Sequence, residues 1–70
     1  MKLTKIAIAK ILEGNTRAFL CSGLDVSYHT LQRWIRDNEP DGKLTTASAL
    51  EIIQKQTGLK QSEILQKNDN

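Results

Sequence analysis

The segment that decides the fold is residues 17–36, RAFLCSGLDVSYHTLQRWIR. Its apolar residues recur at helical spacing on both sides of a short break, which predicts two short helices around a tight turn. Asp25 lies in that turn, where Asp tolerates a positive φ better than most residues. Ser27 is a favourable N-cap for a second helix that runs to about Arg36.

This second helix is expected to have two different flanks. Leu31 and Trp34 lie on one of them. At about 100° per residue, the polar side chains occupy a separate arc of roughly 140°. They are Tyr28, His29, Gln32, Arg33 and Arg36. The pattern predicts that one flank packs against the protein while the other contacts a polar, negatively charged partner, for which double-stranded DNA is the leading candidate.

Three further helices are predicted, and no segment alternates as a strand would. The five expected helices cover about residues 4–13, 17–23, 27–36, 46–57 and 61–66. Helix 4–13 has a broad apolar stripe, formed by Leu3, Ile6, Ala7, Ile8, Ile11 and Leu12. Gly14-Asn15 suits a left-handed cap, and Thr16 is the expected N-cap of the next helix. The start of the fourth helix is open: Thr45 or Thr46 could cap it, and Ser48 with Glu51 has capping-box spacing one turn later. Residues 37–42 form a loop around Pro40. The expected class is all-α, a compact five-helix domain over residues 1–66 with a frayed tail at 67–70.

Charge is distributed unevenly along this 70-residue chain, whose net charge is only +2. Residues 1–36 contain six basic and two acidic residues, a formal charge of +4, whereas residues 37–70 contain four basic and six acidic residues, a formal charge of −2. The basic half coincides with the predicted helix pair, which favours an anionic partner on one face.

Other functional classes have little support in the sequence. The single cysteine, Cys21, forms no internal disulfide, and no Cys/His cluster offers a metal site, so neither a metal nor a cofactor is expected. We find no carboxylate pair of convincing catalytic spacing, no glycine-rich phosphate loop and no nucleophile with a nearby base, and therefore expect no enzyme and no small-molecule ligand. No window approaches the roughly 20 apolar residues of a membrane span, and the N-terminal segment lacks a cleavage site, so a cytoplasmic, nucleoid-associated location is expected.

Two helices that cross steeply need a small residue at their contact and apolar residues behind it. Cys21 is the expected small residue. The expected fillers are Leu20, Leu24, Val26, Leu31 and Trp34. The run LCSGLDVSYHTLQRWI resembles the helix-turn-helix of the Cro and lambda-repressor superfamily of phage and bacterial regulators, and LTTASALEIIQKQTGLKQSEIL is similar to that family's fourth and fifth helices. The chain has Asp25 where most members have Gly, Cys21 where they have Ala, and Arg17 where they have Gln.

The resemblance implies a function and a set of contacts. The base-facing residues would be Ser27, Tyr28, His29, Gln32 and Arg33. Arg17 and Arg36 resemble flanking phosphate contacts, and Lys43, just after the loop, is a further phosphate candidate. The chemistry of the side chains gives the same separation into base contacts and phosphate contacts, because Gln can pair with adenine and Arg with guanine through two hydrogen bonds each. The expected function is sequence-specific DNA binding by a transcription regulator, a repressor of phage or mobile-element type, often a homodimer on a near-palindromic site.

Two alternatives remain open at this stage. The first is a helical protein-interaction module, such as an antitoxin or adaptor, which would bind through the acidic half. The second is an excisionase-like architectural DNA-binding protein, although the helical pattern of residues 46–57 argues against the β-wing that such proteins often have. For self-association, the expected surface is the last two helices, with Leu59, Ile64 and Leu65 exposed.

Overall fold

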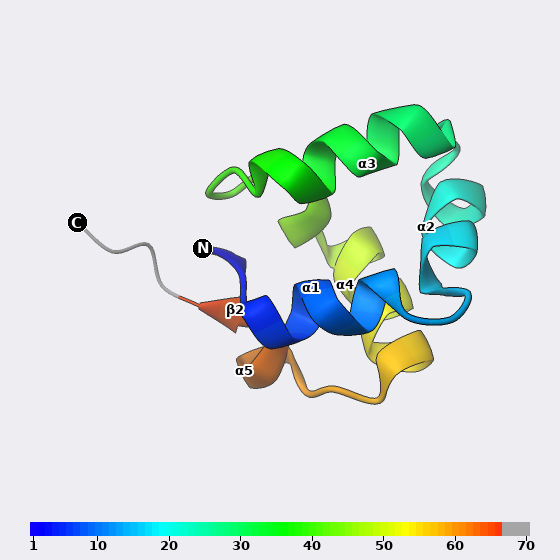
Figure 1. The fold of residues 1–70 in the computed structure, drawn as a ribbon. Coiled ribbons are helices and arrows are strands. Elements are labelled where there is room, and N and C mark those ends of the chain that lie inside the picture. The colour runs from blue at the N-terminus through cyan, green and yellow to red at the C-terminus, as the bar shows by residue number, and fades with distance from the viewer. Residues whose placement is uncertain (67–70) are drawn as a thin grey trace.

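The computed structural model describes residues 1–66, and the predicted tail at 67–70 lies outside the described residues. Over that range the chain is a small, mostly helical domain with five α-helices (Figure 1). They are α1 (Lys5–Leu12), α2 (Thr16–Leu24), α3 (Tyr28–Asp37), α4 (Ala47–Thr57) and α5 (Gln61–Ile64). A single 3-10 turn, η1 (Lys43–Thr45), joins the loop after α3 to α4. The predicted number and order of helices are therefore confirmed.

Hydroxyl side chains begin three of the helices. Thr4, Ser27 and Thr46 accept the backbone N–H of Ala7, Thr30 and Ala49, at 3.1, 3.1 and 3.4 Å. The predicted cap at Ser27 is confirmed, and Thr46 rather than Thr45 begins α4. The predicted cap at Thr16 is wrong. Asn15 takes the N-cap position without a side-chain hydrogen bond, and Thr16, only 5% exposed, is the first residue of α2.

Left-handed residues end three of the helices. Asp25, Asn38 and Gly58 follow α2, α3 and α4 with φ of 54°, 43° and 75°, and their backbone N–H groups bond back into the helix they close. Asp25 thus takes the positive φ predicted for the turn. Gly14, in the connection between α1 and α2, has a φ of +56°, which agrees with the predicted turn there.

The prediction that the chain has no strand is wrong. β1 (Lys2–Leu3) and β2 (Leu65–Gln66) form an antiparallel pair in which Lys2 lies opposite Gln66 and Leu3 opposite Leu65. As a result α5 stops at Ile64, two residues earlier than predicted. Strands of two residues are too short to show alternation in the sequence, and their pairing joins segments from opposite ends of the described chain.

Every helix contributes to one core. Its buried residues are Leu3, Ala7, Ile11, Leu20, Leu31, Ile35, Leu44, Ala49, Leu50, Ile53 and Ile64. The most extensive helix contact is between α2 and α4. At Gly23 the contact leaves no room for a side chain, because an added Cβ would lie 2.4 Å from Cδ1 of Ile52. The core therefore fixes α2, and with it the turn and the start of α3.

The three apolar residues predicted to be exposed at the C-terminal end, Leu59, Ile64 and Leu65, are not exposed. Ile64 is fully buried, and Leu59 and Leu65 are half-buried against the core.

The predicted apolar stripe of α1 is wider than the face that α1 buries. Ile6 and Leu12 are 60% and 44% exposed, whereas Ala7 and Ile11 are buried. Within residues 1–66, no helix has the length and apolar character needed to cross a membrane.

Candidate nucleic-acid interface

Helix α3 packs against the core through one flank only. Leu31 is fully buried and Ile35 is 6% exposed, while Trp34 is half-buried and packs against the core cluster. The residues of α3 are polar on average but strongly amphipathic in their arrangement, and the packing follows this arrangement. Its position at the edge of the domain leaves the opposite flank open to solvent (Figure 1).

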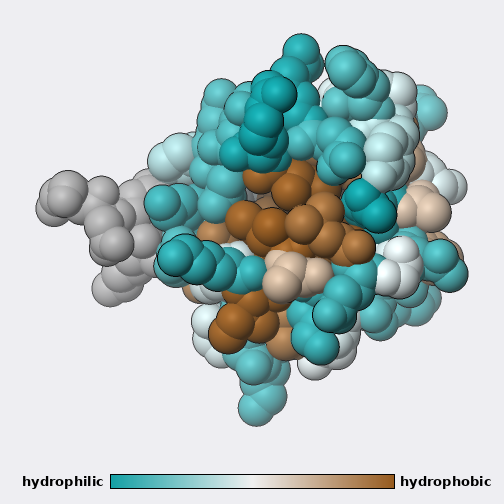
Figure 2. All heavy atoms as spheres, viewed as in Figure 1, coloured by the Kyte–Doolittle hydropathy of each residue, from teal (hydrophilic) through white to brown (hydrophobic). Residues whose placement is uncertain are grey.

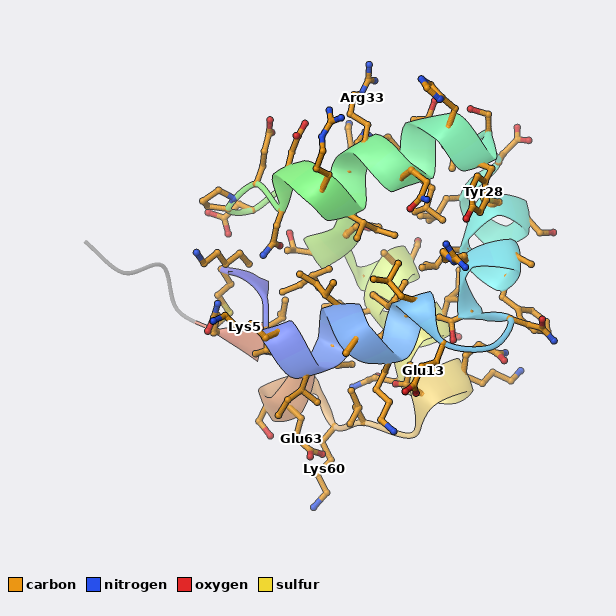
Figure 3. The ribbon with its side chains drawn as sticks, viewed as in Figure 1. Lys5, Glu13, Tyr28, Arg33, Lys60 and Glu63 are labelled. Atoms are coloured by element: carbon orange, nitrogen blue, oxygen red, sulfur yellow. The ribbon has the colours of Figure 1, made fainter. Side chains whose placement is uncertain are left out.

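The open flank carries the polar residues expected from the sequence. Tyr28 is 50% exposed, His29, Arg33 and Arg36 are exposed, and Gln32 is half-exposed. His29, Gln32, Arg33 and Arg36 line one shallow hollow on this surface. Arg33 extends away from the body of the domain (Figure 3). The fold thus presents several hydrogen-bond donors along a single helix, as base and phosphate contacts require.

Tyr28 connects this flank to the start of α2. Its hydroxyl accepts a hydrogen bond from the guanidinium of Arg17, which also lies over the Tyr28 ring at 5.3 Å from the centroid. The same hydroxyl accepts the side-chain N–H of Gln32 at 3.3 Å. Arg17, predicted to flank the interface, is therefore held beside the first turn of α3, and Gln32 is tethered one turn further along.

Ser27 has a different local role from its neighbours. Its hydroxyl oxygen accepts the backbone N–H of Thr30 at 3.1 Å and donates to the Thr30 hydroxyl at 2.9 Å. Both partners lie within the first turn of α3. Ser27 is exposed just before the open flank of α3, but both hydrogen bonds of its hydroxyl are made within the first turn of the helix.

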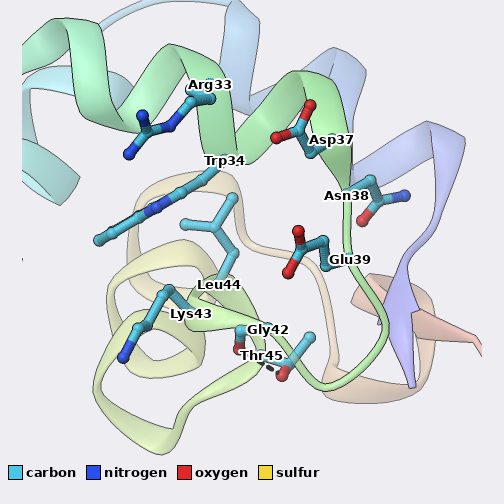
Figure 4. Close-up of a pocket in the computed structure, with 9 residues that line it drawn as sticks. All are labelled: Arg33, Trp34, Asp37, Asn38, Glu39, Gly42, Lys43, Leu44 and Thr45. Carbon is cyan, nitrogen blue, oxygen red and sulfur yellow. Dashed lines mark hydrogen bonds between the residues drawn. The ribbon is translucent and has the colours of Figure 1, made fainter.

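Lys43 lies on the far side of Trp34 from Arg33. These three residues line a hollow between the C-terminal half of α3 and η1, and both cationic side chains extend to the same side of it (Figure 4). The opposite side of the hollow carries the carboxylates of Asp37 and Glu39 (Figure 4). Lys43 was predicted from its position after the loop, and the 3-10 turn is what brings it beside α3.

The exposed ion pair of Arg36 with Asp37 on this surface is weak. Nε of Arg36 lies 3.3 Å from a carboxylate oxygen of Asp37, and the two side chains are 74% and 43% exposed. Pairs this open contribute little to stability, so a phosphate can displace Asp37 from Arg36 at small cost. Asp37 and Glu39 lie at and beyond the C-terminal end of α3, away from Tyr28 at its start, whereas Asp25 lies in the turn three residues before Tyr28.

The remaining chemistry of the described residues is limited. Cys21 is a half-buried free thiol against the core. Over residues 1–66, no three His, Cys, Asp or Glu side chains come together as metal ligands would. No protein family, curated protein or solved structure matches this chain.

Proposed function

We propose that this protein is a sequence-specific double-stranded DNA-binding regulator of the Cro and lambda-repressor-like helix-turn-helix type, with α3 in the major groove. The observation that carries the proposal is the division of α3 into a buried apolar flank and an exposed flank of donors. In such a unit the second helix enters the groove with its N-terminal residues nearest the bases. The arrangement of α2, the left-handed Asp25 and the Ser27-capped α3 fits this use.

The roles follow from chemistry and position. Gln32 is proposed to contact adenine and Arg33 guanine, each through two hydrogen bonds. Tyr28 and His29, in the first turn of α3, are proposed to contact bases nearby, with Ser27 at the edge of that set. Arg17, Arg36 and Lys43 are proposed to bind phosphates, which fixes register and makes affinity depend on salt. A protein bound in this way would repress by blocking polymerase at a promoter, in the cytoplasm, at the nucleoid.

Selection of binding sites from a random pool of duplexes tests the proposal. The wild-type protein should enrich one sequence, whereas Gln32→Ala and Arg33→Ala should each lose about 1–3 kcal/mol of discrimination at one base pair. Arg17→Ala should instead weaken all sequences alike and reduce the salt slope by about 1. Lys55→Ala, which removes an exposed charge from α4, is the matched control and should leave the selected sequence unchanged.

The structure of each variant should be checked by circular dichroism and thermal unfolding, so that lost binding is not mistaken for lost folding. The proposal is refuted if wild-type protein shows no salt-sensitive binding to random duplex at low ionic strength. Unchanged base preferences in both Gln32→Ala and Arg33→Ala would refute the role of α3 specifically.

A further inference from the structure

Helix α1 has apolar side chains on the face that it turns to solvent. Ile6 and Leu12 are 60% and 44% exposed, Ala9 is also exposed, and Ile8 is half-buried. Figure 2 shows an apolar area in the middle of the face toward the viewer, over α1 and the space between α1 and α3. A helix that is apolar around most of its circumference is normally covered on all sides. Within residues 1–66 the core covers α1 on one side only, through Ala7 and Ile11.

The charges that border this face have a symmetric arrangement. Lys5 is at the beginning of α1, and Glu13 immediately follows its end. Both are exposed, and at helical spacing they lie on either side of Ala9, four residues from it in each direction. When the helix is inverted about Ala9, position 5 comes to the level of position 13 and position 6 to that of position 12. The face therefore complements an inverted copy of itself, cation to anion and apolar to apolar.

We propose that the exposed face of α1 binds a second copy of this chain, with the two α1 helices antiparallel about a two-fold axis near Ala9. The small side chain of Ala9 lets two helix axes approach to roughly 8–10 Å. Ile6 and Leu12 of each copy then lose their contact with water, and Lys5 of each copy lies level with Glu13 of the second copy. Contact of a surface with the same surface is what two-fold symmetry requires.

Three features of the free chain are compatible with this contact. Nζ of Lys10 lies 3.7 Å from a carboxylate oxygen of Glu13, but both side chains are about half or more exposed, so this weak pair leaves Glu13 available. The C-terminal end competes poorly as a dimer surface, because Ile64 is fully buried and Leu59 and Leu65 are packed on the core. A 70-residue chain also buries a smaller fraction of its surface than larger domains do, so it gains from covering apolar side chains.

The position of α1 relative to α3 extends the proposed function, on which this step rests. Arg33 points outward from α3 along the plane of the view, whereas the apolar area faces the viewer (Figures 2 and 3). A two-fold axis in front of α1 and parallel to the outward direction of α3 keeps both α3 helices on the same side of the dimer. One face of the dimer would then present two reading helices to a near-palindromic site.

Sedimentation equilibrium without DNA tests the contact. Wild-type protein should show a concentration-dependent monomer–dimer equilibrium, and Ile6→Gln combined with Leu12→Gln should weaken dimerisation by about tenfold or more. Phe19→Gln is the matched control, because Phe19 is a 49%-exposed apolar residue on α2, and it should leave the equilibrium unchanged. Thermal unfolding verifies that each variant is folded.

A charge exchange tests the antiparallel arrangement independently. Lys5→Glu and Glu13→Lys should each weaken dimerisation, and the double variant should restore it, since an inverted partner carries both exchanged charges. A wild-type protein that stays monomeric up to about millimolar concentration, or a double variant no better than either single one, would overturn the proposal. DNA binding by a strictly monomeric wild type would overturn only the dimer, whereas a dimer without DNA binding would overturn only the proposed function.

Discussion

The side-chain amide of Asn38 binds both backbone polar groups of Leu3. Its Oδ1 accepts the Leu3 N–H at 3.0 Å, and its Nδ2 donates to the Leu3 carbonyl oxygen at 3.1 Å. The amide thus takes the place of a peptide group on a neighbouring strand, along the edge of β1. Because Asn38 is also the left-handed residue that ends α3, its side chain joins the end of α3 to the N-terminal segment.

Replacement of Asn38 should separate these two roles. Asn38→Gly keeps the left-handed conformation but removes both hydrogen bonds, so the free energy of unfolding should fall by about 1–3 kcal/mol. Asn38→Ala removes the same bonds and adds the strain of a non-glycine, non-Asn residue at positive φ, and should cost about 1 kcal/mol more. Urea unfolding followed by circular dichroism measures both. Equal stabilities of the Gly and Ala variants would contradict the conformational part of this account.

Ser27 offers a test of whether its importance lies in the helix or in the DNA contact. Ser27→Ala removes the cap of α3 and should lower the free energy of unfolding by about 1 kcal/mol. Ser27→Asp preserves a cap and adds a favourable charge at the helix N-terminus, so stability should be maintained. At the edge of the proposed base contacts, however, its negative charge would be repelled by the DNA, and DNA affinity should drop. An Asp variant that binds DNA as tightly as wild type would show that residue 27 lies away from the interface.

The sequence predicted the helices better than the contacts between them. The number and order of the helices and some of their caps could be predicted because they depend on local signals, such as Ser27 before α3 and Asp25 after α2. The β1–β2 pair could not, since each strand has two residues and its partner is more than 60 positions away. The exposure of Ile6 was missed for a related reason, because helical spacing shows that a stripe is apolar but not how much of it the other helices cover.

At the candidate interface, too, the sequence predicted the features within one helix better than the contacts between helices. Exposed donors on α3 were predictable from the periodicity of residues 28–36. The hydrogen bond from Arg17 to Tyr28 was not, because it depends on the angle at which α2 meets α3. The bond from Gln32 to Tyr28 spans one turn of α3 and depends on the side-chain rotamers of both residues. Gly23 was missed as well. In the sequence, Gly23 is visible only as a glycine within a predicted helix. The structure explains why a glycine fits there, because Ile52 of α4 approaches closely.

The contact between Gly23 and Ile52 should appear as energetic coupling. Gly23→Ala gains up to about 1 kcal/mol of helix propensity, but the new Cβ must displace Cδ1 of Ile52. The single variant should therefore be close to wild type in stability. Ile52→Val removes Cδ1, so Gly23→Ala should stabilise the protein by about 0.5–1 kcal/mol more in that background than in wild type. A double-mutant cycle by thermal unfolding measures the difference, and strict additivity would show that Ile52 yields without cost.

Tyr28→Phe should change what the protein prefers to bind more than how stably it folds. The variant keeps the ring beneath the Arg17 guanidinium but removes the hydroxyl that accepts hydrogen bonds from Arg17 and Gln32. An exposed substitution of this kind should alter stability by less than about 0.5 kcal/mol. If that hydroxyl orients the Gln32 amide toward a base, its loss should cost about 1 kcal/mol, roughly fivefold, of preference at one base pair. Competition binding with duplexes altered at single positions measures this preference, and Tyr28→Phe should affect the same position as Gln32→Ala. An effect spread evenly over all positions would mean that Tyr28 acts through Arg17 and the phosphates instead.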